Sequence, residues 1–232
     1  MRRAVENGYA RGHETRARII SAALTLFGAQ GFDGASTRDI AESAGVNAPA
    51  LLYYFGNKEG VYLACVEHIA TTISNHLATP LDAAQVMLAA DASDEELIEA
   101  FRSIQDCLKR YLFTSTEPDS WRLFMAREQA GLGPLFKDGQ VSDRLQTRIL
   151  PMCSAIVRRL MGCKTAYEES MVRAIAITGQ LVSIHLTRQS VASALGWKSI
   201  DADRVEQIFY VIDEQTVTLL KNLADKKRVS KS

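Results

Sequence analysis

The chain has 232 residues, of which 47% are hydrophobic and 23% charged, and its 27 basic side chains are balanced by 27 acidic ones. This composition is typical of a globular protein with a substantial core, and it excludes a low-complexity chain and a protein that binds nucleic acid through overall basicity. No apolar run reaches the roughly 18 residues needed to cross a bilayer and the amino terminus is polar, so we expect a cytoplasmic protein that does not enter a membrane.

The sequence lacks the common patterns of metal, cofactor and catalytic sites. Its four cysteines stand apart without a Cys-X-X-Cys pair, and its four histidines show no zinc-ligand spacing. Neither a Ser/His/Asp arrangement nor a glycine-rich phosphate loop stands out. We therefore expect no disulfide, no metal ion, no cofactor and no enzymatic activity. A redox-sensing cysteine is an alternative to the ordinary role of cysteine as a small buried side chain.

The first helix is predicted from Thr15 to Gln30, because apolar side chains recur there at helical spacing and Gly31 follows. Near this end five arginines form a local basic patch: Arg2, Arg3, Arg11, Arg16 and Arg18. These arginines either contact phosphates or belong to a solvated helix face and a frayed tail, and the sequence leaves both interpretations open.

Residues 37–59, TRDIAESAGVNAPALLYYFGNKE, predict two short helices joined by a tight turn and followed at once by a third. Ser36 or Thr37 can cap the first helix, and Gly45 allows it to stop in a left-handed conformation. Asn47 is a good cap for the second helix and Asn57 for the third, and the first turn of the second helix accommodates Pro49 because a missing amide costs nothing there. The pattern is that of a helix-turn-helix unit.

Such a unit places its second helix in the major groove of DNA, with the amino-terminal residues of that helix facing the base edges. On that geometry the side chains facing the bases belong to Asn47, Ala48, Pro49, Ala50 and Tyr53. We expect Thr37, Tyr54 and Lys58 to contact phosphates and Arg38 to contact a phosphate or a guanine edge. A cation at the start of a helix, as Lys58 is, indicates a nearby anion. The alternative, that LLYYF is only the apolar side of a small bundle, fails because two adjacent tyrosines on a short helix cannot both be core.

At these residues the chain closely resembles the tetracycline-repressor (TetR) family of transcriptional regulators. The family pattern of a small residue, threonine, a variable pair and Ile-Ala is met at residues 36–41, and its Ala-Gly-Val turn at residues 44–46. The closing pattern, Tyr-X-Tyr-Phe with a small or polar pair and Lys-Glu, is met at residues 52–59, except that Leu52 replaces the usual tyrosine. Pro49 stands where the family often has glycine.

The resemblance implies an all-α protein of about nine helices. Residues 1–60 would form an amino-terminal arm and a three-helix DNA-binding domain, and residues 61–232 a larger helical regulatory and dimerisation domain with a disordered basic tail. A weaker resemblance to the YbiH-like (CecR/CerR) subgroup of the family rests on residues 124–129 (FMAREQ), Pro134, the Gly162-Cys163 pair and residues 195–197 (LGW).

Beyond Glu59 the periodicity predicts further helices. The fourth carries Val61 to Ile73, and residues 79–93, with Pro80, are expected to form a linker. Asp94 should cap the fifth helix, which a break at Glu117-Pro118 ends, and a sixth begins at Ser120. Three more are predicted over residues 140–161, with a kink at Pro151, and over residues 167–189 and 203–226.

The last two helices carry longer apolar stripes than one subunit's core ordinarily needs, and the resemblance implies that they form a two-fold, four-helix dimer interface. The interface residues would include Ile175, Thr178, Val182, Ile208, Ile212 and Leu219. The alternative is that both helices are internal core helices.

A regulator of this kind needs a ligand that prefers one spacing of its two DNA-binding units, and the usual family solution is a cavity among the middle helices. The candidate pocket residues are large or polar side chains on otherwise apolar faces: Phe101, Tyr111, Trp121, Phe124, Met125 and His185. The competing interpretation is that these are ordinary core residues.

The sequence therefore predicts a homodimeric repressor that binds a palindromic, double-stranded operator and is released by a small apolar or amphipathic effector. Two alternatives share part of the pattern. One is an activator or architectural DNA-binding protein without small-molecule control, and the other is a helical protein-interaction adaptor, in which Lys58 would have no phosphate to bind.

Overall fold

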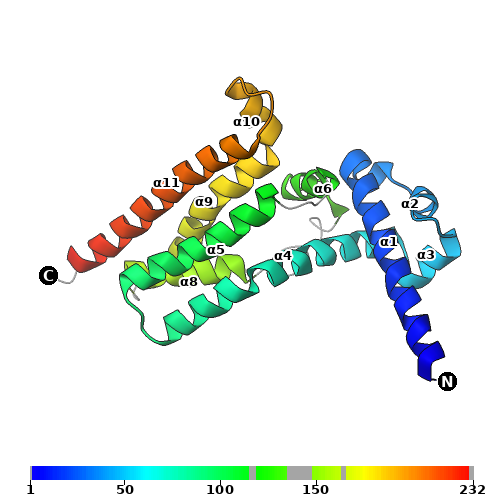
Figure 1. The fold of residues 1–232 in the computed structure, drawn as a ribbon, viewed down its shortest axis with the longest axis horizontal. Coiled ribbons are helices and arrows are strands. Elements are labelled where there is room, and N and C mark those ends of the chain that lie inside the picture. Colours follow the sequence, from blue (N-terminus) through cyan, green and yellow to red (C-terminus); the bar gives the residue numbers. More distant parts are fainter. Residues whose placement is uncertain (1, 115–118, 135–147, 163–165, 230–232) are drawn as a thin grey trace. The chain divides into compact units, whose positions relative to one another are not determined.

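The computed structural model describes residues 2–114, 119–134, 148–162 and 166–229. Every element in these ranges is a helix, which confirms the predicted all-α class (Figure 1). The ten helices are α1 (Arg2–Gly34), α2 (Thr37–Ser43), α3 (Ala48–Phe55), α4 (Lys58–Ala89), α5 (Asp94–Thr114), α6 (Asp119–Gln129), α8 (Ile149–Met161), α9 (Tyr167–Leu186), α10 (Arg188–Ala194) and α11 (Ala202–Val229). No helix in this part of the chain is long and apolar enough to span a membrane.

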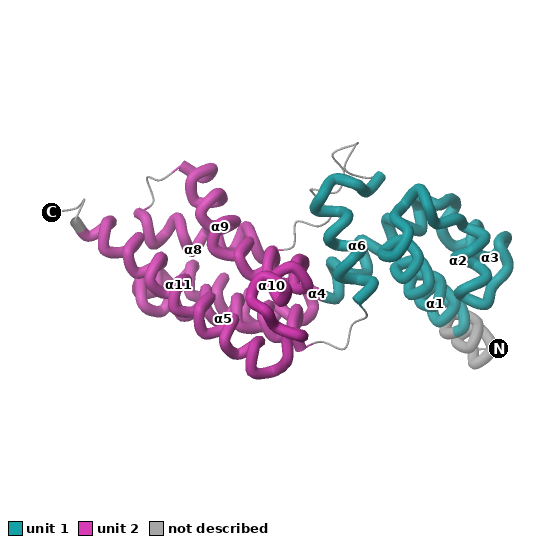
Figure 2. The backbone as a smooth tube through the Cα atoms, turned by 90° about the horizontal axis from the view of Figure 1, so that it is seen from above, with its two compact units in different colours: residues 1–72, 117–145 teal, residues 73–116, 146–232 magenta. Residues whose placement is uncertain are grey.

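Contacts divide the chain into two compact units, which Figure 2 shows in different colours. Unit 1 comprises residues 1–72 and 117–145, and unit 2 comprises residues 73–116 and 146–232. The division falls within α4, and it assigns α6 to the same unit as α1, α2 and α3. The amino-terminal unit thus contains a segment that follows α5 in the sequence, in addition to the three helices expected of a DNA-binding domain.

Helix α1 is longer than the sequence predicted, because it begins at Arg2 instead of Thr15. Its helical geometry breaks at Gly31, where φ is 77° and ψ is 177°, a conformation that glycine adopts without steric cost. Downstream of residue 15 the expected apolar stripe is buried, with Ile19, Leu24 and Phe27 almost inaccessible to solvent. The side chains of residues 1–10, among them Arg2 and Arg3, lie outside the described set.

Helix α4 contradicts the predicted linker, since it continues through Pro80 to Ala89. Proline has no N–H to bond the carbonyl four residues earlier, which here belongs to His76. The thiol of Cys107 on α5 donates to that carbonyl across an Sγ–O distance of 3.2 Å. A side chain from a neighbouring helix therefore satisfies the acceptor that Pro80 leaves open, and the helix is not interrupted.

The cap of α5 also differs from the prediction. Ser93, not Asp94, caps this helix: its hydroxyl accepts from the Glu96 amide at 3.2 Å, and the Glu96 carboxylate accepts from the Ser93 amide at 2.8 Å. This reciprocal pair is a capping box, and it lowers the pKa of Glu96 through hydrogen bonding. Asp94 instead forms an ion pair with Lys227 of α11.

Two further differences concern the carboxyl-terminal half. Pro151 lies in the first turn of α8, where a missing amide needs no partner, so no kink forms there. Helix α10 was not predicted, and it occupies the segment between the last two long helices. The predicted helical stretch 140–147 lies outside the described residues. The core of unit 2 is one apolar cluster to which α4, α5, α8, α9 and α11 contribute.

Candidate nucleic-acid interface and effector site

Three caps within unit 1 shape the segment from α2 to the start of α4. The Ser36 hydroxyl accepts from the Asp39 amide at 3.1 Å, the Asn47 Oδ1 atom accepts from the Ala50 amide at 2.8 Å, and the Asn57 Oδ1 atom accepts from the Gly60 amide at 2.7 Å. Gly45 has a φ of 64°, which turns the chain between α2 and α3. All three cap predictions are confirmed, with Ser36 chosen over Thr37.

Helix α3 buries one face and exposes the other. Leu51 is fully buried, whereas Leu52 is 48% and Tyr53 85% exposed. The exposed side chains on this helix also include Ala48 and Pro49. The structure therefore presents three of the predicted base-facing residues to solvent together with Leu52, which the sequence analysis had only noted as a departure from the family pattern.

The remaining predicted DNA contacts lie on this helix or beside it. Asn47 and Arg38 are exposed, and Thr37, Ala50, Tyr54 and Lys58 are half-buried. The Lys58 ammonium lies 4.4 Å from the ring centroid of Phe32, and the Arg16 guanidinium lies 5.3 Å from that of Phe55. Ring contacts thus place two cations of unit 1 beside the helix-turn-helix segment, while Arg11 and Arg18 are exposed on α1.

Helix α6 packs closely on α1 within unit 1. The Arg127 guanidinium donates to the backbone carbonyl oxygens of Gly28 and Ala29, both at 3.1 Å. At Gly28 the two backbones approach so closely that a Cβ atom would overlap the carbonyl group of Ser120. The sequence analysis did not predict this packing, although a glycine in the middle of a helix was an available signal for close approach.

Glu128 of α6 is buried against α4. The Tyr62 hydroxyl donates to the Glu128 carboxylate, and the Tyr62 ring packs on Phe27 and Phe124 with centroid distances of 4.9 and 4.8 Å. Burial raises the pKa of Glu128, and the hydrogen bond from Tyr62 opposes part of that rise. Burial, followed by the hydrogen bond to Glu128, raises the pKa of Tyr62 as well.

The six predicted pocket residues fall into both units. In unit 1, Trp121 packs on His68 with a centroid distance of 5.1 Å, Phe124 is buried and Met125 is half-buried. In unit 2, Phe101 is buried, Tyr111 packs on His76 at 4.8 Å and His185 packs on Phe113 at 5.5 Å. Only the second group of three belongs to unit 2, so only Phe101, Tyr111 and His185 are candidates for a pocket there.

Two polar side chains of α5 that the sequence analysis missed are buried in unit 2. Gln105 is 2% and Lys109 4% exposed. Lys109 pairs with Asp106, and its ammonium also lies 5.3 Å from the Phe209 ring centroid. Both polar atoms of the Gln105 amide are buried without a hydrogen-bond partner. Gln105 stands four residues after Phe101, on the same face of the helix, and a polar residue at that position was a readable signal.

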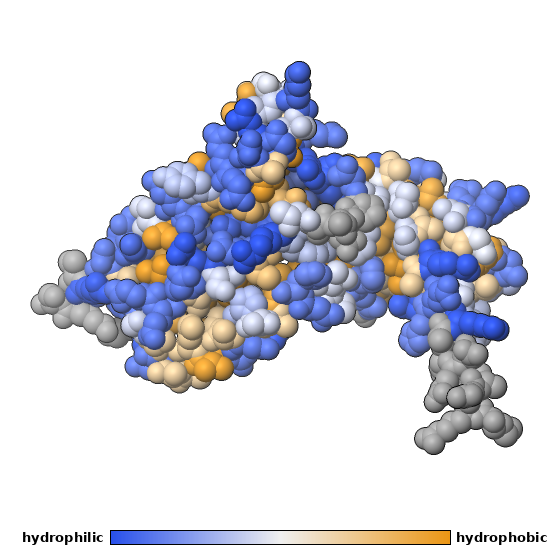
Figure 3. Space-filling view, viewed as in Figure 1, coloured by the Kyte–Doolittle hydropathy of each residue, from blue (hydrophilic) through white to orange (hydrophobic). Residues whose placement is uncertain are grey.

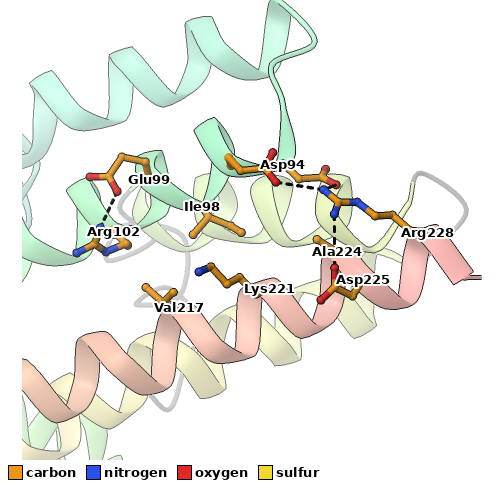
Figure 4. A pocket seen from close by; sticks show the side chains of 10 residues that line it. Asp94, Ile98, Glu99, Arg102, Val217, Lys221, Ala224, Asp225 and Arg228 are labelled. Carbon is orange, nitrogen blue, oxygen red and sulfur yellow. Dashed lines mark hydrogen bonds and ion pairs between the residues drawn. The ribbon is translucent and has the colours of Figure 1, made fainter.

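A groove of about 390 Å³ runs between α5 and α11 (Figure 4). Its walls carry four acidic and three basic side chains, and most of them form ion pairs, including Arg102 with Glu99 and Arg228 with Asp225. Lys221 points into the groove. None of the six predicted pocket residues lines it. Its mixed charges do not suit an apolar effector.

The predicted dimer-interface residues divide by burial. Ile208, Ile212 and Thr178 are buried inside the subunit, so they have little surface to offer a partner, as the alternative of internal core helices implies. Ile175 is 49% and Leu219 48% exposed, and Val182 is half-buried. The same two helices expose further large apolar side chains that the prediction omitted: Tyr167 and Val172 on α9, and Tyr210 and Val211 on α11.

Two of the three described cysteines, Cys65 and Cys153, are poorly suited to redox sensing. Cys65 and Cys153 are buried, and burial raises the pKa of the Cys65 thiol and raises that of Cys153 to about 12. Since the thiolate is the reactive form, both thiols are inert near neutral pH. Cys163 lies outside the described residues. Within the described ranges, no three His, Cys, Asp or Glu side chains gather in a way that would hold a metal ion.

The helix-turn-helix with its exposed α3 defines a class of DNA-binding proteins, and comparison with known proteins agrees. Residues 19–65 match the model of the bacterial regulatory proteins of the tetR family, and residues 97–223 match that of the C-terminal domain of the HTH-type transcriptional dual regulator CecR. The chain belongs to the TetR family of transcriptional regulators, with a carboxyl-terminal part of the CecR type.

Individual relatives are consistent with this assignment. The dual regulator CecR of Shigella flexneri is 28% identical over 210 residues, which cover 90% of each chain. Among solved structures, a TetR-family regulator from Mesorhizobium loti is 17% identical, covers 90% of this chain and 96% of its own, and has a TM-score of 0.57. AibR, solved with isovaleryl coenzyme A and operator DNA, is 15% identical, with coverages of 87% and 97% and a TM-score of 0.60. These relatives are regulators and not enzymes.

Proposed function

We propose that the protein is a homodimeric repressor that binds a palindromic operator and leaves it when a small apolar or amphipathic effector binds in unit 2. The observation that carries the DNA-binding half is the exposed face of α3, held by the Asn47 cap and flanked by Arg38 and Lys58. In this arrangement α3 enters the major groove, Thr37, Tyr54 and Lys58 contact phosphates, and the two half-sites lie about 34–36 Å apart.

The dimer is supported by exposed apolar side chains on α9 and α11. Val172, Ile175, Tyr210, Val211 and Leu219 are large side chains, each at least two-fifths exposed. Two such helices from each subunit would cover one another across a two-fold axis, and burial of these side chains favours association. A dimer also reads two half-sites, which compensates for the weak hold of a single short recognition helix.

A pair of charge substitutions tests this interface. Ile175→Glu with Leu219→Glu should weaken dimerisation and reduce operator affinity by about tenfold or more, because two carboxylates would be buried against the partner. Sedimentation velocity and operator titration measure the two effects. The matched control is Val86→Glu, since Val86 is equally apolar and 67% exposed on α4. Figure 3 shows a patch of apolar residues at the lower left, where Figure 1 draws the end of α4 and the start of α5. Dissociation by the control alone would move the interface to α4.

The effector half is supported by the buried polar groups of unit 2. Gln105 and Lys109 lie one helical turn apart on α5, next to the turn that carries Phe101. From Lys109 a series of ring contacts runs through Phe209 and Phe113 to His185. Leaving the two amide atoms of Gln105 unpaired costs about 1–3 kcal/mol each, and an amphipathic effector with a polar group there would remove that cost. AibR, which has a related fold, was solved in complex with isovaleryl coenzyme A and operator DNA.

A second candidate function is transcriptional activation at some promoters. CecR of Shigella flexneri, which matches nearly the whole chain, is named a dual regulator. Transcription assays on a promoter that carries the bound site distinguish the two modes, because a repressor lowers the transcript level and an activator raises it. The mode of DNA binding by α3 is the same in both.

Gel-shift titration with the DNA upstream of the protein's own gene tests the DNA-binding role of Lys58. Lys58→Ala should weaken binding to every sequence alike and reduce the salt slope by about one, because one phosphate contact is lost. Lys198→Ala is the control, since Lys198 is an exposed lysine of unit 2. Unchanged affinity in Lys58→Ala would favour the protein-interaction adaptor and would contradict the phosphate assignment.

A further inference from the structure

The exposed face of α3 is made almost entirely of hydrocarbon. Ala48, Pro49, Leu52 and Tyr53 stand at positions i, i+1, i+4 and i+5, so they lie on one side of the helix. All four are exposed, whereas Leu51 on the opposite side is fully buried. The surface that a helix-turn-helix unit inserts into the major groove is therefore apolar, apart from the phenol hydroxyl of Tyr53.

The one amide side chain at the start of α3 is already engaged. To read adenine with two hydrogen bonds, an asparagine must accept from the base with Oδ1 and donate with Nδ2. In Asn47 the Oδ1 atom accepts from the Ala50 amide at 2.8 Å and thereby caps the helix. Using that oxygen for a base would compete with the cap and loosen the first turn, although the Ala50 amide also donates to the Asn47 backbone carbonyl at 3.1 Å. Pro49 adds no donor, because proline has no N–H.

Among the base edges in the major groove, the 5-methyl group of thymine is the apolar feature, and it is the partner that apolar side chains contact. We propose that α3 recognises its half-site mainly through thymine methyl groups, which pack against Ala48, Pro49, Leu52 and the ring of Tyr53. In this interpretation Leu52 is a specificity-determining residue. Arg38, which is exposed on α2 and forms no ion pair within the described part of the chain, supplies the polar contact to a guanine or a phosphate.

The balance of forces favours this assignment. Leu52 and Tyr53 expose large apolar surfaces in the free protein. Covering these surfaces on binding lowers the free energy of the complex, because apolar surface is removed from water. Every base pair presents polar groups in the major groove, but thymine alone adds a methyl group there, beside its O4 acceptor. Cytosine at the same position offers hydrogen-bonding groups and no methyl contact. The face of α3 therefore favours thymine through contact with this methyl group.

The inference rests on the proposed binding of α3 to DNA. It is tested by selecting DNA sites and then removing single methyl groups from the selected site. The full-length protein selects its sites from a random duplex library. In the enriched site each thymine is then replaced by uracil, which removes only the 5-methyl group. Each replacement at a position facing α3 should weaken binding roughly threefold to fivefold. Thymines outside the footprint of α3 provide the matched positions at which uracil should have no effect.

Protein variants assign the methyl contacts. In Leu52→Ala and Tyr53→Ala, the loss caused by uracil should shrink toward onefold at the position that each side chain covers, as a double-mutant cycle measures. Lys58→Ala should lower affinity for both duplexes equally and preserve the ratio between them. An enriched site that tolerates uracil everywhere, or that lacks thymine where α3 lies, overturns the methyl-reading inference and leaves the DNA-binding function intact. Failure to enrich any sequence overturns both.

Discussion

Two regions of unit 1 are held together in different ways. In the segment from α2 to the start of α4, each capping bond joins residues three positions apart, as at Ser36, Asn47 and Asn57. The packing of α6 depends on bonds between residues 66 to 99 positions apart, which join Glu128 to Tyr62 and Arg127 to α1. The DNA-reading segment thus forms from local chemistry, whereas the packing of α6 on α1 and Tyr62 depends on the tertiary fold. The two regions should respond independently to mutation.

The largest effect is expected from Gly28→Ala. A Cβ atom there would overlap the backbone of Ser120, which cannot move without displacing α6, so we expect a loss of about 3 kcal/mol in the free energy of unfolding. Urea unfolding measures it. Gly12→Ala is the control in the same helix, because its Cβ would lie 3.6 Å from the Tyr54 hydroxyl, an ordinary contact. That variant should be neutral or slightly stabilising. Equal losses in both variants would refute the close approach of α1 and α6.

Arg127→Ala should cost somewhat less, about 2 kcal/mol, since two backbone carbonyls of α1 lose a charged donor. Hydrogen exchange should show faster opening of α6, with the amides of α3 unchanged, if the two regions are independent. Arg127→Lys is a useful comparison, because a lysine cannot donate to both carbonyls in the same fork geometry. Faster exchange in α3 as well would mean that the DNA-reading segment depends on α6.

Asn47→Ala tests whether the segment from α2 to the start of α4 can be weakened without affecting α6. The loss of the cap should cost about 1 kcal/mol and loosen the first turn of α3, while the bonds of α6 stay intact. Operator affinity should fall, and exchange of the α6 amides should not change. Asn47→Asp keeps an oxygen that caps the helix, so it should retain the stability although it places a negative charge near DNA. A stability loss in Asn47→Asp equal to that in Asn47→Ala would argue against the cap.

The smallest effect concerns pH. Burial raises the pKa of Glu128 above its value in the unfolded chain, so the folded protein holds a proton that the unfolded chain releases. The free energy of unfolding should therefore fall as pH rises from the ordinary carboxylate range through the raised pKa. Glu128→Gln should remove this dependence. The free energy of unfolding of the variant, relative to that of the wild type, should therefore be higher at pH 7 than at pH 4. Parallel pH profiles for the two proteins would contradict the raised pKa.

The sequence by itself determined the DNA-reading segment, down to the caps Asn47 and Asn57 and the turn at Gly45, because these features depend on side chains bonding to backbone within one helical turn. It also determined the helical class and most helix positions, because apolar side chains recur with the period of a helix. Both kinds of signal are local, and no knowledge of distant residues is needed to read them.

The tertiary structure decided what local patterns cannot encode. Helix α4 passes Pro80 because the Cys107 thiol reaches the carbonyl that the proline leaves free. Ile208 and Ile212 are buried, while their neighbours Tyr210 and Val211 are exposed. The apolar pattern alone does not predict which of its residues another helix will cover. Arg127 and Glu128 acquired their partners only when α6 packed in unit 1. Each outcome depends on contacts between residues far apart in the chain, and only the folded protein brings those residues together.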